Sequence, residues 1–243
     1  MLFPPQCPCC RREVGESAEG GGLAESAGRR EPESAICVSC ARELAADVAR
    51  CGRCGAPSDA ADCRECSRRP RAWGRVAVLS AYAGGLREAV LRAKRPAGVD
   101  AAAALAGLLI RKHVATLQGW GSNVVVPVPM HWVRRSFRGG SAADEIAAVM
   151  ARRLGVPWSR DVARSRATRM QNELPIEDRP RNVAGAFRAR RRLDGCRVLL
   201  VDDVMTTGAT LEACARVLLK AGARAVDVAV VARADSPGSR GDG

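Results

Sequence analysis

Aromatic residues are scarce in this chain, at 3% of its 243 residues. The hydrophobic fraction of 47% still supports a core, which must then consist mainly of Ala, Val and Leu. Proteins that hold single-stranded nucleic acid commonly stack its bases on aromatic rings. The composition therefore leaves few side chains for a base-stacking surface.

Long apolar runs are absent too, since even the Ala-rich stretch 101–110 is too short to span a bilayer. Residues 1–5 lack the basic and then apolar order with which a signal peptide begins. We therefore expect a cytoplasmic protein without a membrane span. Thiols stay reduced in the cytoplasm, so clustered cysteines are expected to bind metal rather than to form disulfides.

The formal net charge is +13, and nearly all of the positive charge is arginine. Acidic and basic residues almost cancel in residues 1–70, whereas residues 131–192 are rich in arginine and poor in acids. Arginine suits bidentate binding of phosphate and pyrophosphate. Genomic base composition explains a high arginine content equally well, so composition alone assigns no role to any single arginine.

Eight of the 11 cysteines form four C-x-x-C pairs near the start of the chain. The pairs are Cys7 and Cys10, Cys37 and Cys40, Cys51 and Cys54, and Cys63 and Cys66. Two such pairs complete a tetrahedral site, so the eight thiols predict two structural Zn²⁺ ions. Grouping the pairs in sequence order is the first interpretation, with crossed pairing and a dithiol redox role as alternatives.

The chain divides into two predicted parts. Residues 1–70 form the cysteine-rich module, in which 13–34 is an aperiodic Gly, Glu, Ala and Ser-rich segment and predicts a mobile insertion. Residues 71–233 alternate predicted strands (76–82, 123–128, 156–163, 198–201 and 226–231) with predicted helices (86–94, 101–114, 141–154 and 211–220). With right-handed crossovers this pattern predicts an α/β fold, a parallel sheet flanked by helices, followed by a disordered tail at 234–243.

Residues 198–210 are the most informative stretch of this second part. They read Val-Leu-Leu-Val-Asp-Asp-Val-Met-Thr-Thr-Gly-Ala-Thr, an apolar strand followed by a loop and then a helix. The N-terminus of a helix favours an anion. Gly208 would let the backbone approach a phosphate closely, and the hydroxyls of Thr206, Thr207 and Thr210 would add donors.

Two adjacent acids, Asp202 and Asp203, lie beside this loop. Without a ligand or metal they would repel each other and any nearby phosphate, so we expect them to accept hydrogen bonds from sugar hydroxyls. The stretch as a whole predicts a ribose 5-phosphate site. The alternative is a helix N-cap built from Thr, with both acids solvated at the end of the strand.

This stretch resembles the motif with which type I phosphoribosyltransferases bind phosphoribosyl pyrophosphate (PRPP). Other segments narrow the resemblance to the ComF family of competence-associated, phosphoribosyltransferase-like proteins. In the family's order they are the four cysteine pairs, residues 82–94, Val126 to His131, Arg134, Arg138 with Gly139, Thr168, Gln171, Arg179, Asn182, Gly185, Phe187 and the stretch 198–210. One departure is that Gly140-Ser141-Ala142 stands where the family usually has Phe-Asn-Gln.

The resemblance implies a double zinc ribbon and a PRPP site that works with Mg²⁺. The catalytic residues that it implies are Asp202 and Asp203. The residues that it implies for PRPP binding are Thr206, Thr207, Gly208, Ala209 and Thr210 at the 5-phosphate, Pro127, Val128, Pro129, Arg134 and Arg138 at the diphosphate, and Thr168 and Gln171 in a hood loop.

Three functions fit these observations. The first is a phosphoribosyltransferase linked to competence and DNA uptake, which transfers phosphoribosyl from PRPP to an acceptor that the sequence does not identify. The second is a competence factor that binds single-stranded DNA on its basic surface and contacts proteins of the competence machinery through the zinc module. The third is an adaptor that senses PRPP without turnover.

Overall fold

The computed structural model describes residues 6–14, 36–46, 48–58, 63–68, 70–130, 141–166, 175 and 178–235. Its helices are α1 (Val38–Leu44), α2 (Arg64–Arg68), α3 (Gly84–Ala93), α4 (Val99–Gly119), α6 (Ala142–Leu154), α7 (Arg179–Val183) and α8 (Ala209–Lys220). Its strands are β1 (Val76–Ala81), β2 (Val124–Pro127), β3 (Val162–Arg164), β4 (Phe187–Ala189), β5 (Arg197–Met205) and β6 (Ala225–Arg233). Most of the predicted insertion and of the predicted tail lies outside the described residues.

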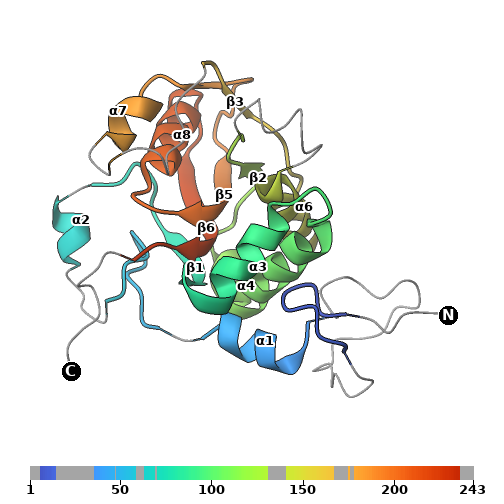
Figure 1. Ribbon diagram of the computed structural model, residues 1–243. Helices are drawn as coiled ribbons and strands as arrows, with labels where there is room; N and C mark the ends of the chain where they lie inside the picture. Colours follow the sequence, from blue (N-terminus) through green and yellow to red (C-terminus); the bar gives the residue numbers. More distant parts are fainter. Residues whose placement is uncertain are drawn as a thin grey trace.

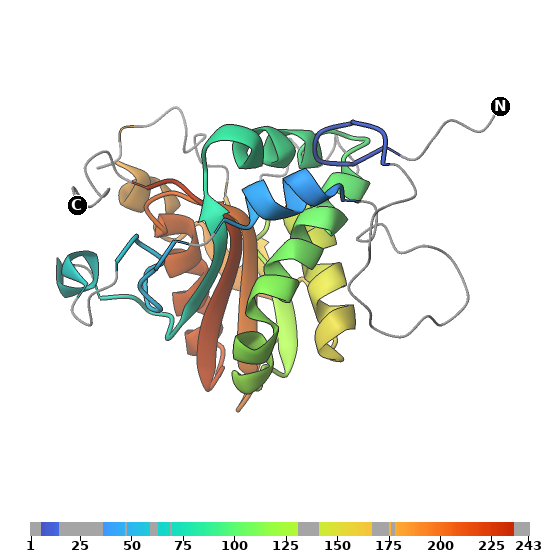
Figure 2. The same ribbon diagram turned by 90° about the horizontal axis from the view of Figure 1, so that it is seen from below.

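Four parallel strands form the central sheet, in the order β1-β6-β5-β2 (Figure 1). Alternate residues along each strand face opposite sides, so the sheet contributes to two cores. Helices α3, α4 and α6 cover one face, and α8 covers the other (Figure 2). Both cores consist mostly of Ala, Val and Leu. The predicted fold class, a parallel sheet flanked by helices, is therefore confirmed.

Two strands have other boundaries than the hydrophobic pattern predicts, because hydrogen-bond pairing with a neighbouring strand decides where they begin and end. Strand β5 continues through both aspartates to Met205, because β6 pairs with it as far as Met205 and Arg233. The predicted strand 156–163 is wrong in extent. Only Val162–Arg164 forms a strand, which pairs antiparallel with β4 in a separate two-stranded sheet.

Helix α4 extends beyond the predicted range and kinks at His113, whose φ is −125°. The ring Nε2 of His113 donates a hydrogen bond to the carbonyl of Val78 at 2.9 Å. The preceding Lys112 donates to the carbonyl of Leu79 at 3.0 Å. These bonds hold the end of α4 against β1, an edge strand of the sheet. Among the described residues, no helix has both the length and the apolarity that crossing a membrane requires.

The cysteines that open the chain lie at two separate places on this framework. Cys7 and Cys40 belong to the same buried cluster as α3 and α4. The second group forms a small cluster of its own around Cys54 and Cys63. Figure 2 shows the segments that carry them apart from each other, with α1 and residues 6–14 beside α3 and α4, and α2 and residues 48–58 beside β1.

Arg233, at the end of β6, ties the second cysteine group to the sheet. Its side chain is only 4% exposed, and all three guanidinium nitrogens donate hydrogen bonds. Their acceptors are the carbonyl of Cys54 at 3.1 Å, Asp235 at 2.8 Å and Glu65 at 2.6 Å. Asp235 also accepts two bonds from Arg50, each at 3.1 Å. The buried charge is thus fully paired.

Replacing Arg233 should be strongly destabilising, because Arg233→Leu leaves Glu65 without its partner and Asp235 with Arg50 alone. We expect a loss of about 3–5 kcal/mol of unfolding free energy in urea denaturation. Arg192→Leu is the matched control, because the Arg192 and Asp194 pair is 79% and 61% exposed and should contribute little to stability. Equal losses in the two variants would contradict the anchoring role.

Candidate functional site

The loop between β5 and α8 has the conformation that a phosphate cradle requires. Gly208 is the N-cap of α8 and adopts a left-handed φ of 77°. No side chain caps it, while Thr207 Oγ1 accepts a hydrogen bond from the Ala209 amide at 3.3 Å. The first turn of α8 therefore faces the carboxyl end of the sheet with its partial positive charge. This is the place at which the sequence predicts a phosphate.

Asp202 and Asp203 lie at this end of β5 in different electrostatic surroundings. The Asp202 carboxylate accepts a hydrogen bond from the Asp203 amide at 2.9 Å. Burial and the charge of Asp203 raise the pKa of Asp202 to about 8, although Lys94 and Arg164 act in the opposite direction. Asp203 forms an ion pair with Lys94 at 3.3 Å. The site therefore places an acid that is easily protonated beside one that is paired with a cation.

Residues 71–73 support the loop between β5 and α8 from behind. Arg71 Nη1 donates to the carbonyl of Thr207 at 3.0 Å, and the Ala72 amide donates to Glu212 on α8 at 2.9 Å. A Cβ at position 208 would lie 2.9 Å from Cη2 of Trp73, so packing and the positive φ both require glycine there. The supporting segment is thus in close contact with the loop that it precedes by more than a hundred residues.

The loop predicted to receive the diphosphate begins beside these acids. Pro127 and Val128 are buried, and the Val128 amide donates to the carbonyl of Val201 at 2.8 Å, next to Asp202. Pro129 follows and is half-buried. The other residues predicted to contact PRPP on this side lie outside the described residues. They are Arg134, Arg138, Thr168 and Gln171.

Ser141 and Ala142, which replace two amides of the family pattern, have structural roles in this chain. Ser141 is the N-cap of α6 and accepts a hydrogen bond from the Ala143 amide at 3.2 Å. Ala142 is buried against the core that α3, α4 and α6 share. These two positions therefore start a helix.

The eight paired cysteines form two groups of four in sequence order. Cys7, Cys10, Cys37 and Cys40 make the first group, Cys51, Cys54, Cys63 and Cys66 make the second, and the sulfurs of each group lie within 4.8 Å of one another. The Sγ atoms of Cys10 and Cys37 are 3.7 Å apart, and those of Cys54 and Cys63 are 3.5 Å apart. Four sulfurs around one zinc ion at its usual bond length would be about 3.8 Å apart. Both groups fit a tetrahedral zinc site, with no crossed pairing.

Each group contains one thiol that ionises easily. Burial alone would raise the pKa of Cys37, but hydrogen bonds from Ser39 and the Cys40 amide outweigh it and lower the pKa to about 6. In the second group, bonds from the amides of Arg53 and Cys54 outweigh burial in the same way and lower the pKa of Cys51 to about 7. A thiolate is the form that binds a metal, so these two residues are suited to bind it first.

Sequence reasoning did not assign three cations that the fold brings to the two aspartates and the loop between β5 and α8. Lys94 reaches Asp203, Arg71 holds the loop, and Arg164 stacks on Phe187 at 4.8 Å while acting on the charge of Asp202. All three lie far from the motif in the sequence.

The parallel sheet, the strand–loop–helix unit and the paired acids define a protein with the type I phosphoribosyltransferase fold. The phosphoribosyl transferase domain family matches residues 141–242, which include β5, the loop and α8. The purine phosphoribosyltransferase of Pyrococcus horikoshii is a solved structure with 20% identity and a TM-score of 0.34, and the match covers 56% of this chain and 82% of that chain.

Two groups of relatives identify the family. The DNA utilization protein YhgH of Salmonella typhimurium is 35% identical over 200 residues, which are 79% of this chain and 88% of that protein. Competence protein F of Haemophilus influenzae is 29% identical over 211 residues, which are 83% of this chain and 92% of that protein. The chain belongs to the ComF family, as its motifs predict.

Asp202→Asn should stabilise the protein without ligand, and more so at higher pH. Folding raises the pKa of Asp202, so the folded state holds a proton that the unfolded chain would release. This lowers the free energy of unfolding from about pH 4 upward, and the loss grows until about pH 8. We expect a gain that is small at pH 5 and grows by up to about 1.4 kcal/mol per pH unit towards pH 8 in urea denaturation.

The opposite sign is expected of Asp227→Asn, because Asp227 is a buried carboxylate held by Arg75 at 2.6 and 3.0 Å. This variant should lose stability at both pH values. A pH-independent effect of Asp202→Asn would show that the charge of this carboxylate is not what makes it costly.

Proposed function

We propose that this protein binds PRPP with Mg²⁺ at the end of β5 and transfers its phosphoribosyl group to an acceptor. The observation that carries the proposal is the juxtaposition of Asp202 and Asp203 with the uncapped loop at Gly208. The two aspartates suit a sugar and the loop suits a phosphate, and both belong to a single strand–loop–helix unit. The acceptor is left open, because no group of described side chains points to a particular base.

Each part of PRPP has a proposed partner in this chain. The 5-phosphate binds to Thr206, Thr207, Gly208, Ala209 and Thr210, at the N-terminus of α8. Asp202 and Asp203 accept hydrogen bonds from the ribose hydroxyls. The diphosphate lies along Pro127, Val128 and Pro129, and Arg134, Arg138, Thr168 and Gln171 complete its surroundings.

Charge explains how these residues would promote the reaction. As pyrophosphate leaves, positive charge develops on the ribose ring, and carboxylates held next to the ring stabilise it. Bound Mg²⁺ would neutralise part of the charge on the diphosphate. Lys94 holds the Asp203 carboxylate in place through its ion pair. No side-chain nucleophile is required.

The two cysteine groups are proposed to hold two structural zinc ions. They form a double ribbon in residues 1–70, which precedes the phosphoribosyltransferase-like part at 71–233 and a tail at 234–243. The distances between their sulfurs support this reading. Binding would release protons from the thiols whose pKa burial raises, such as Cys54.

Zinc analysis should find two ions per chain. Cys37→Ser and Cys51→Ser should each lose one, because each removes a thiolate from a different group. Cys196→Ser is the control and should keep both, since Cys196 belongs to neither group. Loss of both ions in a single variant would contradict two separate sites.

A second candidate function concerns DNA. Two relatives are named DNA utilization protein and competence protein F. Exposed arginines on and beside β4, including Arg188 and Arg190, offer positive charge to a phosphate backbone. In this reading the fold serves as a scaffold that binds single-stranded DNA, and the zinc module contacts other proteins of the competence machinery.

Calorimetric titration of PRPP and Mg²⁺ into the zinc-loaded protein tests the first function. We expect binding that disappears in the double variant Asp202→Asn, Asp203→Asn and survives in Asp194→Asn. Asp194 is the control because it precedes β5 and so lies at the opposite end of the strand.

The outcomes separate the three readings. If PRPP does not bind to the wild-type protein, the proposal is overturned and single-stranded DNA binding becomes the favoured function. Binding followed by release of pyrophosphate, when bases are supplied, would establish a transferase. Binding without release under the same conditions would leave an adaptor that senses PRPP.

A further inference from the structure

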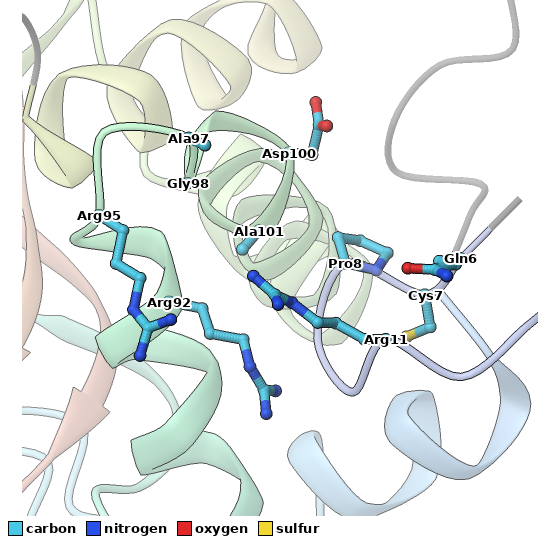
Figure 3. A pocket seen from close by; sticks show the side chains of 10 residues that line it. All are labelled: Gln6, Cys7, Pro8, Arg11, Arg92, Arg95, Ala97, Gly98, Asp100 and Ala101. Atoms are coloured by element: carbon cyan, nitrogen blue, oxygen red, sulfur yellow. The ribbon is translucent and has the colours of Figure 1, made fainter.

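A pocket of 330 Å³ lies between the first cysteine group and the turn that joins α3 to α4. Three arginines extend into it from three places in the chain (Figure 3). Arg11 comes from the loop after Cys10, Arg92 from the last turn of α3, and Arg95 from the turn itself. The proposed ribose-phosphate loop, residues 206–210, contributes no residue to this pocket.

Few carboxylates compensate the positive charge of the three arginines. Arg92 has one acidic partner, Glu88, at the long distance of 3.5 Å, and the side chain of Glu88 is 66% exposed. Within the described part of the chain, neither Arg11 nor Arg95 forms an ion pair. Asp100 is the one acid that lines the pocket, and Figure 3 shows its carboxylate pointing away from the three arginines.

Arg11 occupies a backbone position that is unfavourable for arginine. Its φ is 65°, and among the described residues it is the only one other than glycine with a positive φ. The second cysteine group has the same local geometry, because the Arg11 amide donates to the Cys7 carbonyl at 2.7 Å and the Gly55 amide donates to the Cys51 carbonyl at 2.8 Å. Gly55, with a φ of 72°, occupies the equivalent position there.

Strain at one residue often marks a site where function, and not stability, selects the side chain. Glycine adopts this conformation without steric cost, and the second cysteine group uses it. Arginine at the equivalent position of the first group adds strain and a charged side chain that reaches the pocket. Something other than the turn itself therefore accounts for Arg11.

We propose that Arg11, Arg92 and Arg95 form a binding site for phosphate groups, distinct from the ribose-phosphate loop. Guanidinium groups bind phosphate oxygens through paired, charge-assisted hydrogen bonds. The pocket also contains Gly98, the N-cap of the long helix α4, which has no side-chain cap of its own. No aromatic residue lines it, so the site recognises phosphate rather than a base.

The turn between α3 and α4 serves both sites. Lys94 points to Asp203 in the ribose-phosphate site, and its neighbour Arg95 lines the arginine pocket. The bound phosphate groups can belong to a small polyphosphate or to the backbone of an oligonucleotide. Both are tested directly.

The test uses the zinc-loaded full chain as wild type, Arg11→Gly, Arg95→Ala and Arg87→Ala. Arg87 is exposed on α3 outside the pocket, so its variant makes the same change in net charge. Inorganic triphosphate is titrated by calorimetry and a labelled oligothymidylate by fluorescence anisotropy, both at one fixed salt concentration. Thermal unfolding and zinc content are measured on every variant.

We expect Arg11→Gly and Arg95→Ala to weaken binding of at least one probe by about tenfold or more, with Arg87→Ala close to wild type. Arg11→Gly should also unfold at an equal or higher temperature with its zinc retained, because glycine relieves the strain. Binding of the oligonucleotide alone would identify a phosphodiester backbone, and binding of triphosphate a small ligand.

Three results would overturn the proposal. One is unchanged binding in Arg11→Gly, and another is an equal loss in Arg87→Ala, which would mean that net charge alone matters. The third is loss of zinc from Arg11→Gly, which would assign Arg11 to neutralising the cysteine thiolates. The site does not depend on PRPP, so a wild-type protein that fails to bind PRPP leaves this test intact.

Discussion

The pairing of β5 with β6 as far as Met205 and Arg233 is the constraint on which the rest of the molecule depends. It keeps β5 extended past its apolar run, so that both aspartates project from a paired strand at the end of the sheet. At the same point it delivers Arg233 to a buried network with Cys54, Glu65 and Asp235. A fully paired buried guanidinium is costly to separate. The second cysteine group is thereby fixed next to the loop between β5 and α8.

This proximity brings the amino-terminal part into contact with the loop between β5 and α8. The ring nitrogen of Trp73 donates to the carbonyl of Arg53, within the second cysteine group, at 2.7 Å, while the same ring packs beside Gly208. Arg71 binds the Thr207 carbonyl from the same segment. The order of the loop is therefore coupled to the order of the cysteine group through short and direct contacts.

Sequence reasoning succeeded where chemistry is local and failed where it depends on distant neighbours. The loop at Gly208 and the C-x-x-C pairs were detectable because each is defined by residues a few positions apart. Arg71 and Lys94 were not, since nothing near them in the sequence indicates which part of the fold they meet. The raised pKa of Asp202 was equally hidden, because it comes first from burial. The predicted extent of strand 156–163 was wrong because hydrophobicity does not reveal where the pairing partner of a strand begins and ends.

By itself, then, the sequence determined the fold class and the family and supplied the proposed site residues, because periodicity, spacing and glycine positions are properties of neighbouring residues. Tertiary structure alone decided which cysteines share a group, which cations face the acids, and that Arg11, Arg92 and Arg95 meet in one pocket. The physical reason is that charge and burial act through space. Residues far apart along the chain acquire their electrostatic surroundings only when the sheet and its helices bring them together.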